Sequence, residues 1–212
     1  VSAACSLDPY VAMFAVDSLR QLADKLLCRS ELAGFAAQGD AIRPLGSVLR
    51  CSDSVAVREL AIACVAHIVD SHTERIGGGW WAVIDALGVA ASDSSAQVVA
   101  NSIDIMCPVF QALYKGQPGD GLGGHECLEE CITAAIAAVG NMSCGEDLAP
   151  ATAALELFQT LCLNLAESES HRKSPSNWLA IFGPLAAIAR SDARPEIADT
   201  AATVLFYSIT TN

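Results

Sequence analysis

The chain has 212 residues, a net charge of −12, 52% hydrophobic residues and only 6% aromatic residues. This charge argues against nucleic-acid binding, which requires a basic face that neutralises phosphates. The length allows one domain with a sizeable core, built mainly from Ala, Leu, Ile and Val, as in closely packed helices. Val1–Pro9 has neither a basic start nor a long apolar run, so we expect no signal peptide.

The first elements are amphipathic helices separated by polar turns. Pro9–Cys28 carries an apolar stripe that includes Phe14 and Leu22, which predicts one helix. A short helical turn is expected over Glu31–Ala37. A helix over Ala41–Leu49 should follow, ending at Ser52-Asp53.

The next two helices flank a run of glycines. Apolar residues recur at helical spacing through Val55–Asp70, which predicts a longer helix. Gly77-Gly78-Gly79 interrupts the pattern, and Trp80-Trp81 opens the next helix, which turns again at Ser92-Asp93. A helix of about 20 residues then runs through Leu113, and we expect Pro108 to kink it because proline lacks the backbone donor.

The second half repeats this organisation. Gly116–Gly124 and His171–Ser176 read as loops, and the pattern predicts no strand. Charge-free stretches such as Cys131–Cys144 are too short to span a bilayer, which needs about 20 residues. Further helices are expected at about Cys127–Asn141, Ala149–Ala166, Asn177–Arg190 and Pro195–Thr210.

A short motif recurs at the turns. Its copies are Asp53-Ser-Val-Ala-Val-Arg, Asp93-Ser-Ser-Ala-Gln-Val and Asp192-Ala-Arg-Pro-Glu-Ile, and Asp147 opens a weaker copy. The shared pattern is Asp, two variable residues, Ala or Pro, one variable residue, then Val or Ile. Paired helices repeating at about 40 residues indicate an all-α fold, a right-handed α-solenoid of antiparallel helix pairs with HEAT- or armadillo-like repeats. The expected single domain covers 1–212, with units at roughly 9–50, 41–70, 79–114, 124–167 and 177–211.

Candidate reactive groups are few. His125-x-Cys127-x3-Cys131 lacks the second ligand pair that zinc usually requires, so we assign no metal and no cofactor. No Gly-x-Ser-x-Gly elbow supports a nucleophile, so we assign no catalytic residue. The nine cysteines are scattered and odd in number, and we interpret them as small core residues in a reducing compartment.

Charge is distributed unevenly along the chain. Residues 76–171 contain twelve acidic residues and one basic residue, Lys115, whereas the two flanking parts are nearly neutral. One interpretation is a solvated face that maintains solubility. The other is an acidic docking surface for a basic partner. The sequence leaves both open.

Three stretches in a fixed order carry a resemblance to a known family. They are Val16–Leu27, Glu31–Pro44, and Ile76–Trp80 followed by Ala90–Asp93. The chain resembles the first "homology downstream" (HDS) module of the large guanine-nucleotide exchange factors for Arf GTPases, of the BIG type and the yeast Sec-seven type. The match is clear from Phe14 to Asp93. One departure is Gly77-Gly78, where the family usually has a basic residue and Ser.

The resemblance implies a non-catalytic regulatory module, cytoplasmic and peripheral to Golgi and trans-Golgi membranes. Such modules act in autoinhibition and in recruitment by GTP-bound Arf, and the expected partners are that GTPase and other domains of the same exchange factor. The catalytic exchange domain has no counterpart here, and membranes are contacted only indirectly. A generic helical-repeat scaffold unrelated to Arf is the alternative.

We place the partner site in Glu31–Pro44 together with Arg75–Trp81. Both segments lie at breaks between helices, where a solenoid places loops near one rim. The alternative is that Asp40 and Arg43 simply pair with each other at a helix start. The candidate residues are Glu31, Gln38, Asp40, Arg43, Arg75 and Trp80.

Overall fold

A computed structural model describes residues 2–5, 8–29, 31, 36–115, 125–167 and 175–211. This part of the chain consists of helices and turns, with no strand among the described residues. The all-helical prediction is therefore confirmed. The elements are η1 (Ser2–Cys5), α1 (Pro9–Leu27), α2 (Ala36–Cys51), α3 (Val55–His72), α4 (Trp80–Ala90), α5 (Ala96–Lys115), α6 (His125–Ser143), α7 (Leu148–Glu167), α8 (Pro175–Ser191) and α9 (Pro195–Thr211).

Most predicted helix boundaries agree with these to within two or three residues, and the largest difference is at α2. This helix begins at Ala36, five residues before the predicted start, and continues through Pro44 to Cys51. Asp8 caps α1, since its carboxylate accepts the amide of Tyr10 at 2.9 Å. The predicted loop over 116–124 and residues 171–174 of the predicted loop over 171–176 lie outside the described residues, and the prediction was wrong for Pro175 and Ser176, which begin α8.

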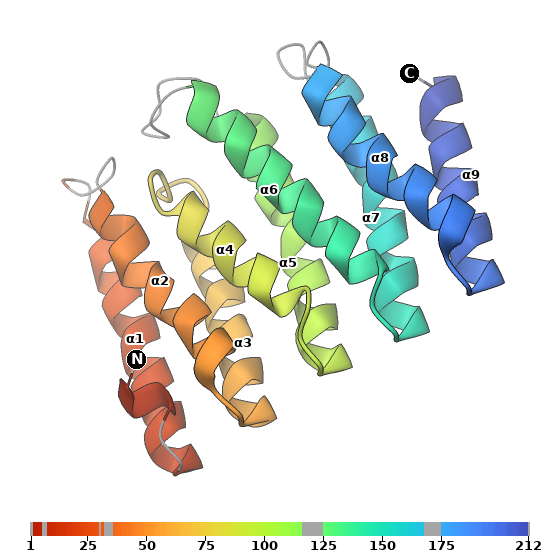
Figure 1. The fold of residues 1–212 in the computed structure, drawn as a ribbon. Coiled ribbons are helices and arrows are strands. Elements are labelled where there is room, and N and C mark those ends of the chain that lie inside the picture. Colours follow the sequence, from red (N-terminus) through yellow and green to blue (C-terminus); the bar gives the residue numbers. More distant parts are fainter. Residues whose placement is uncertain are drawn as a thin grey trace.

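The helices form two rows (Figure 1). One row contains α2, α4, α6 and α8, and the other contains α1, α3, α5, α7 and α9, with each helix packed against the next in its row. Short turns join α2 to α3, α4 to α5, α6 to α7 and α8 to α9, and Figure 1 shows all four along the lower edge. We call this edge the turn rim, comprising residues 52–54, 91–95, 144–147 and 192–194.

The core lies between the two rows. Phe110 and Phe158 are fully buried there, and most of the remaining core residues are aliphatic, as the composition predicted. In α5 the window Ala96–Leu113, and in α7 the window Leu148–Glu167, are apolar and long enough to cross a membrane by composition alone. Because 50% and 44% of these windows are buried against protein, their apolar faces already serve the core.

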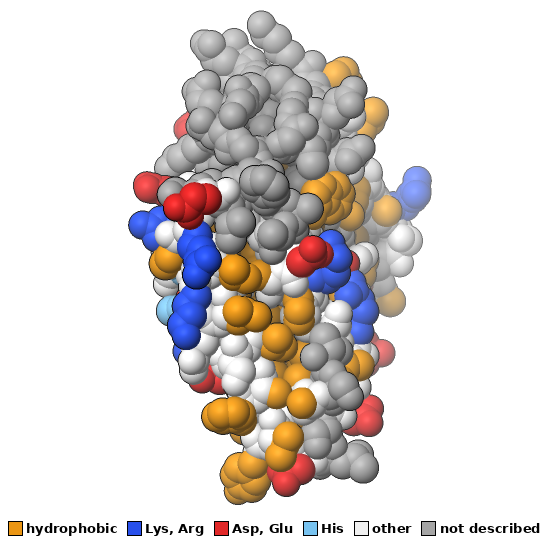
Figure 2. Space-filling view, turned by 90° about the vertical axis from the view of Figure 1, so that its left-hand side faces the viewer, with side chains coloured by type: hydrophobic (Ala, Val, Ile, Leu, Met, Phe, Trp, Pro, Cys, Tyr) orange, Lys and Arg blue, Asp and Glu red, His pale blue; other side chains and the backbone are white. Residues whose placement is uncertain are grey.

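Helix α1 closes one end of its row and leaves an apolar face in solvent. The side chain of Tyr10 is 85% exposed and that of Phe14 is 77% exposed. Figure 2, which views this end of the molecule, shows hydrophobic side chains along the face with Lys and Arg on both sides. At the opposite end, Phe206 and Ile209 of α9 are also exposed.

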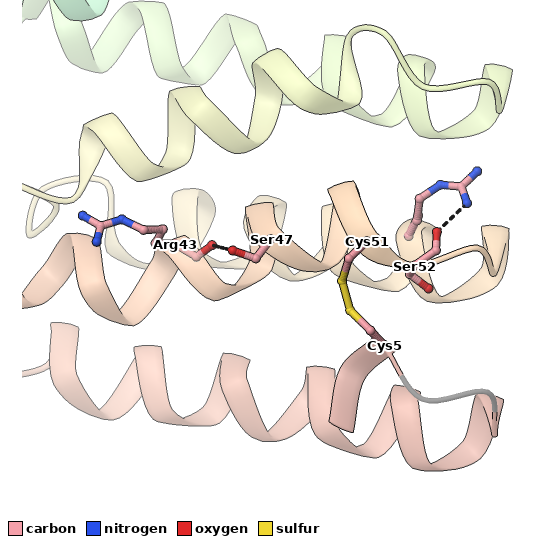
Figure 3. The surroundings of a disulfide bond; sticks show 6 residues. Cys5, Arg43, Ser47, Cys51 and Ser52 are labelled. Atoms are coloured by element: carbon pink, nitrogen blue, oxygen red, sulfur yellow. Dashed lines mark hydrogen bonds between the residues drawn. A yellow bond between two sulfur atoms is a disulfide. The ribbon is translucent and has the colours of Figure 1, made fainter. Parts of the chain in front are cut away.

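The cysteines differ from the sequence interpretation. Cys5 of η1 and Cys51 of α2 form a disulfide, with Cα atoms 6.2 Å apart, which attaches η1 to the end of α2 (Figure 3). Interpreting all cysteines as unpaired core residues was therefore wrong for this pair. Cys64 and Cys162 are buried as expected, and burial raises the pKa of the Cys64 thiol to about 11. Cys144, in contrast, is exposed.

Candidate functional site

The predicted partner segments lie on adjacent elements. Segment 36–44 is the first part of α2, and 75–81 leads into α4, which packs directly against α2. Figure 1 shows the starts of both helices at the upper edge, opposite the turn rim. The expectation that both segments lie near one rim therefore agrees with the arrangement of the described helices.

Gln38 links the two segments from the inside. Its side-chain amide donates from Nε2 to the carbonyl of Arg75 at 2.9 Å, and its Oε1 accepts the amide of Gly77 at 2.9 Å. The residue is only 1% exposed. Gln38 therefore fixes the loop before α4 instead of facing a partner, which corrects its expected surface position.

Close packing at Gly79 explains why this loop is rich in glycine. A Cβ atom on Gly79 would lie 3.0 Å from Cδ1 of Ile42 and 3.3 Å from Cγ2 of Ile76. These side chains would have to shift by a few tenths of an ångström to make room for a side chain here. The glycine thus allows the start of α4 to approach α2 closely, at a position where Gln38 adds its two hydrogen bonds.

The two tryptophans at the start of α4 have different environments. Trp80 is 3% exposed and belongs to the core, so its expected surface role is not compatible with its burial. Trp81 is 41% exposed. Successive helical residues are about 100° apart, so of two adjacent tryptophans only one can enter the core. The sequence carried this signal, but it did not show which of the two is exposed.

The remaining candidates are exposed and charged. Asp40 and Arg43 form an ion pair of 2.9 Å in which both side chains are 65% exposed, as the local-pairing alternative expected. Arg75 is also exposed, with its guanidinium 3.6 Å from the Sγ atom of Cys28. Figure 3 shows the Arg43 side chain near the middle of α2, pointing away from the disulfide. Glu31, which lies before α2, is exposed.

We call Glu31, Asp40, Arg43, Arg75 and Trp81 the α2–α4 surface. It combines both signs of charge with one exposed indole, on a backbone fixed from beneath by Gln38. Tryptophan and arginine are the residue types most often found at the energetic centres of protein interfaces. The surface is thus chemically suited to a protein partner.

At the turn rim, buried polar groups join successive turns. Nε of Arg58 in α3 donates to Asp93 at 2.8 Å, and a second guanidinium nitrogen donates to the same carboxylate at 3.1 Å. A third nitrogen donates to the carbonyl of Ser52 at 2.9 Å. The side chains of Arg58 and Asp93 are only 10% and 6% exposed. The motif that begins at Asp93 gave no sign of this link between turns.

Arg194 makes an equivalent link at the other end of the rim. It pairs with Asp192 at 2.8 Å, and it also donates to the carbonyls of Gly145 and, at 3.4 Å, Ser143. Its hydrogen bonds to Asp192 hold the pKa of that carboxyl at about 2. The guanidinium therefore connects the α8–α9 turn to the α6–α7 turn.

The first copy of the predicted Asp motif does not align with the other two copies relative to the helix that follows. Asp93 and Asp192 each accept the amide two residues ahead, at 2.8 Å, and each lies three residues before a helix. The residue three before α3 is Ser52, not Asp53, which is exposed. The Asp53 copy carries Arg58 where the pattern requires Val or Ile. This mismatch indicated in the sequence that the copy was not equivalent to the others.

The structure tests for a metal site only among the side chains that it describes. Among the described side chains, no group of three His, Cys, Asp or Glu is placed to hold an ion. The side chains of His125, Cys127 and Cys131 lie outside this set, so the structure does not describe that motif.

Comparisons with known proteins identify the segment that carries the α2–α4 surface. Residues 25–107 match the family described as Mon2/Sec7/BIG1-like, HDS. The chain is 38% identical over 130 residues to brefeldin A-inhibited guanine nucleotide-exchange protein 1 of Rattus norvegicus, covering 59% of this chain and 7% of the relative. The human protein of the same name is 38% identical over 95 residues, covering 45% and 5%. Protein 2 of Arabidopsis thaliana is 38% identical over 114 residues, covering 54% and 6%.

The described residues form an all-helical fold, and part of the chain is similar to a short stretch of large guanine-nucleotide exchange proteins. More particularly, residues 25–107 match the HDS family model, which confirms the resemblance to the HDS module of the large Arf exchange factors noted in the sequence. The matched part contains both segments of the α2–α4 surface. The matching region is only a small part of the length of these relatives.

Proposed function

We propose that this chain is a non-catalytic regulatory module of a large Arf exchange factor, which binds a GTP-bound Arf-family GTPase through the α2–α4 surface. The observation that supports this most is the overlap between the HDS match over 25–107 and the exposed residues at the start of α2 and α4. Binding of activated Arf would recruit more exchange factor to membranes that already carry it.

The proposal requires a nucleotide-dependent contact. GTPases change the order of their switch segments between the GTP and GDP states, so a surface that binds these segments distinguishes the two. On the α2–α4 surface, Trp81 would supply apolar contact, while Arg75 and the Asp40–Arg43 pair would supply polar contacts. The same surface could instead contact another domain of the exchange factor. We propose that such a contact would contribute to autoinhibition.

We further propose a cytoplasmic location, peripheral to Golgi and trans-Golgi membranes, with the membrane contacted only through Arf. A basic residue near an anionic leaflet contributes about 1 kcal/mol, and residues 76–171 offer one among twelve acids. We expect weak binding to anionic liposomes without Arf. Tight, salt-sensitive binding to such liposomes would contradict the indirect mode.

The two rows of helices support a second element of the proposal. We assign the helix pairs to HEAT- or armadillo-like repeats of a right-handed solenoid, in which the pairs joined at the turn rim correspond to repeat units. Such stacks present extended rims to partners. The interpretation agrees with the placement of the α2–α4 surface at one rim and the turns at the other (Figure 1).

Co-sedimentation tests the function directly. The chain is mixed with liposomes carrying GTP-loaded or GDP-loaded Arf, and the bound fraction is measured. We expect binding only with the GTP-loaded form. Equal binding to both forms, or none, would favour the alternative of a general helical scaffold. In a fluorescence exchange assay the chain should leave the intrinsic nucleotide release rate of Arf unchanged.

A further inference from the structure

The turn rim contains three junctions between successive turns, and two of them are filled by an arginine. Arg58 joins the α2–α3 turn to the α4–α5 turn through Ser52 and Asp93. Arg194 joins the α8–α9 turn to the α6–α7 turn through the carbonyls of Ser143 and Gly145. In both, a guanidinium lies against backbone carbonyls just after the end of a helix.

The junction between these two is open. A pocket of about 480 Å³ lies between the α4–α5 and α6–α7 turns, which is within the range of about 300–1,000 Å³ that is usual for ligand sites. We call it the middle pocket. Residues from both turns line it, together with Val99 of α5 and Asn141 and Met142 of α6.

The sequence explains why this junction lacks an arginine. Arg58 is the fourth residue of α3, and the fourth residue of α5 is Val99, which forms part of the pocket wall. Lys115, the one basic residue of 76–171, lies at the opposite end of α5, while Arg58 and Arg194 reach the pocket lining only from its two sides, where both are held by the flanking junctions. The middle pocket therefore has the position of a missing link between turns.

The surroundings of the pocket favour a cation. Helices α4 and α6 end beside it while α5 and α7 begin there, so the opposite partial charges of the helix ends offset each other and the side chains decide the sign. The carboxylates of Glu146 and Asp147 lie at its edge, exposed and without an ion pair in the described part of the chain. A guanidinium presents five donors in a planar fork, which suits a site lined by carbonyl, hydroxyl and carboxylate oxygens.

We propose that the middle pocket binds an arginine side chain of a partner protein, which completes the row formed by Arg58 and Arg194. The acidic stretch 76–171 then acts as a docking face at this one place, and the partner segment must be basic. The proposal does not depend on Arf binding at the α2–α4 surface, which lies at the opposite edge of the helix rows.

The test uses NMR titration of the 212-residue chain with a short Gly-Ser peptide that contains one arginine. The control peptide has citrulline in its place, which keeps the shape and removes the charge. We expect saturable shifts of backbone amides in 91–95 and 144–147, with the citrulline peptide at least tenfold weaker. Absence of saturable shifts in these turns, or equal binding of the two peptides, would overturn the proposal.

Two variants locate the site. Val99→Arg supplies the missing side chain from within and should abolish peptide binding. The combined change Glu146→Gln and Asp147→Asn affects exposed side chains only, so it remains informative if Val99→Arg fails to fold, and it should weaken binding at least fivefold. Asp53→Asn, an exposed acid on the neighbouring turn, is the matched control. If Asp53→Asn weakened peptide binding as much as the combined change does, the attraction would be due to overall charge, and the proposal of a specific pocket would be overturned.

Discussion

The two edges of this molecule use polar residues in opposite ways. On the turn rim, Arg58 and Asp93 are buried and their hydrogen bonds join successive helix pairs. On the α2–α4 surface, Asp40 and Arg43 make an ion pair of similar length, but both side chains are largely in solvent. A distance alone therefore does not identify a structural residue, because burial decides how much an ion pair contributes to stability.

The largest stability effect should come from the turn rim. Arg58→Ala leaves the Asp93 carboxylate buried without its partner, so we expect a loss of about 3–5 kcal/mol in the free energy of unfolding. Urea unfolding followed by circular dichroism measures it. Arg43→Ala removes the same residue type from an exposed pair and is the control. A loss below about 1 kcal/mol for Arg58→Ala would show that the buried pair is not structurally important.

Gln38 tests the comparison between buried and exposed polar residues, because it lies beneath the α2–α4 surface but is itself buried. Gln38→Ala leaves the Arg75 carbonyl and the Gly77 amide without their partner, at about 1–3 kcal/mol for each group that stays unsatisfied. Exposed Gln21 of α1 is the matched control, and Gln21→Ala should change stability by less than about 0.5 kcal/mol. Equal stability of the two variants would mean that Gln38 contributes no more to stability than an exposed glutamine does.

The Asp192–Arg194 pair predicts a pH dependence. Folding lowers the pKa of Asp192 from 3.8 to about 2, so its contribution is present above about pH 4 and is lost as the pH falls through 2. Asp192→Asn should therefore be less stable than the wild type at pH 5, and the difference should shrink towards pH 2. Thermal unfolding across this range measures it. A difference that is constant with pH would mean that the charge of Asp192 is not responsible.

The smallest effect is expected at the exposed pair. Arg43→Ala and Asp40→Ala should each change the free energy of unfolding by less than about 0.5 kcal/mol, since both side chains are 65% exposed. Chemical denaturation of the two single variants and the double variant measures their coupling. A loss above about 2 kcal/mol in either single variant would place the pair with the structural residues of the turn rim.

Local patterns were sufficient for the helices and insufficient for contacts between them. Apolar periodicity placed α3 and α9 almost to the residue, and the Ser-Asp turns marked the ends of α2 and α4. In contrast, the burial of Gln38 depends on a loop 37 residues further along the chain. The bond from Arg58 to Asp93 spans 35 residues, and nothing in either segment specifies its partner.

The candidate site was predicted with the right segments and some wrong residues. Each segment includes the start of a helix, α2 or α4, and the sequence marks the start of α4 through Gly77–Gly79. Which face of α4 meets α2 is a property of packing, so the exposed indole proved to be Trp81 and not Trp80. Sequence spacing indicated that only one of the two tryptophans is exposed, but it could not show which one.

The central claim is that the α2–α4 surface contacts GTP-bound Arf while the turn rim maintains the fold. Calorimetric titration of GTP-loaded Arf into the wild type, Trp81→Ala, Arg75→Ala and Asp53→Asn tests it most directly. We expect Trp81→Ala to bind at least tenfold more weakly, and Arg75→Ala several-fold more weakly with nearly unchanged thermal unfolding. Asp53→Asn, on the turn rim, should bind like the wild type. Unchanged affinity in Trp81→Ala and Arg75→Ala, or a loss of affinity in Asp53→Asn as large as theirs, would contradict this division between the two edges.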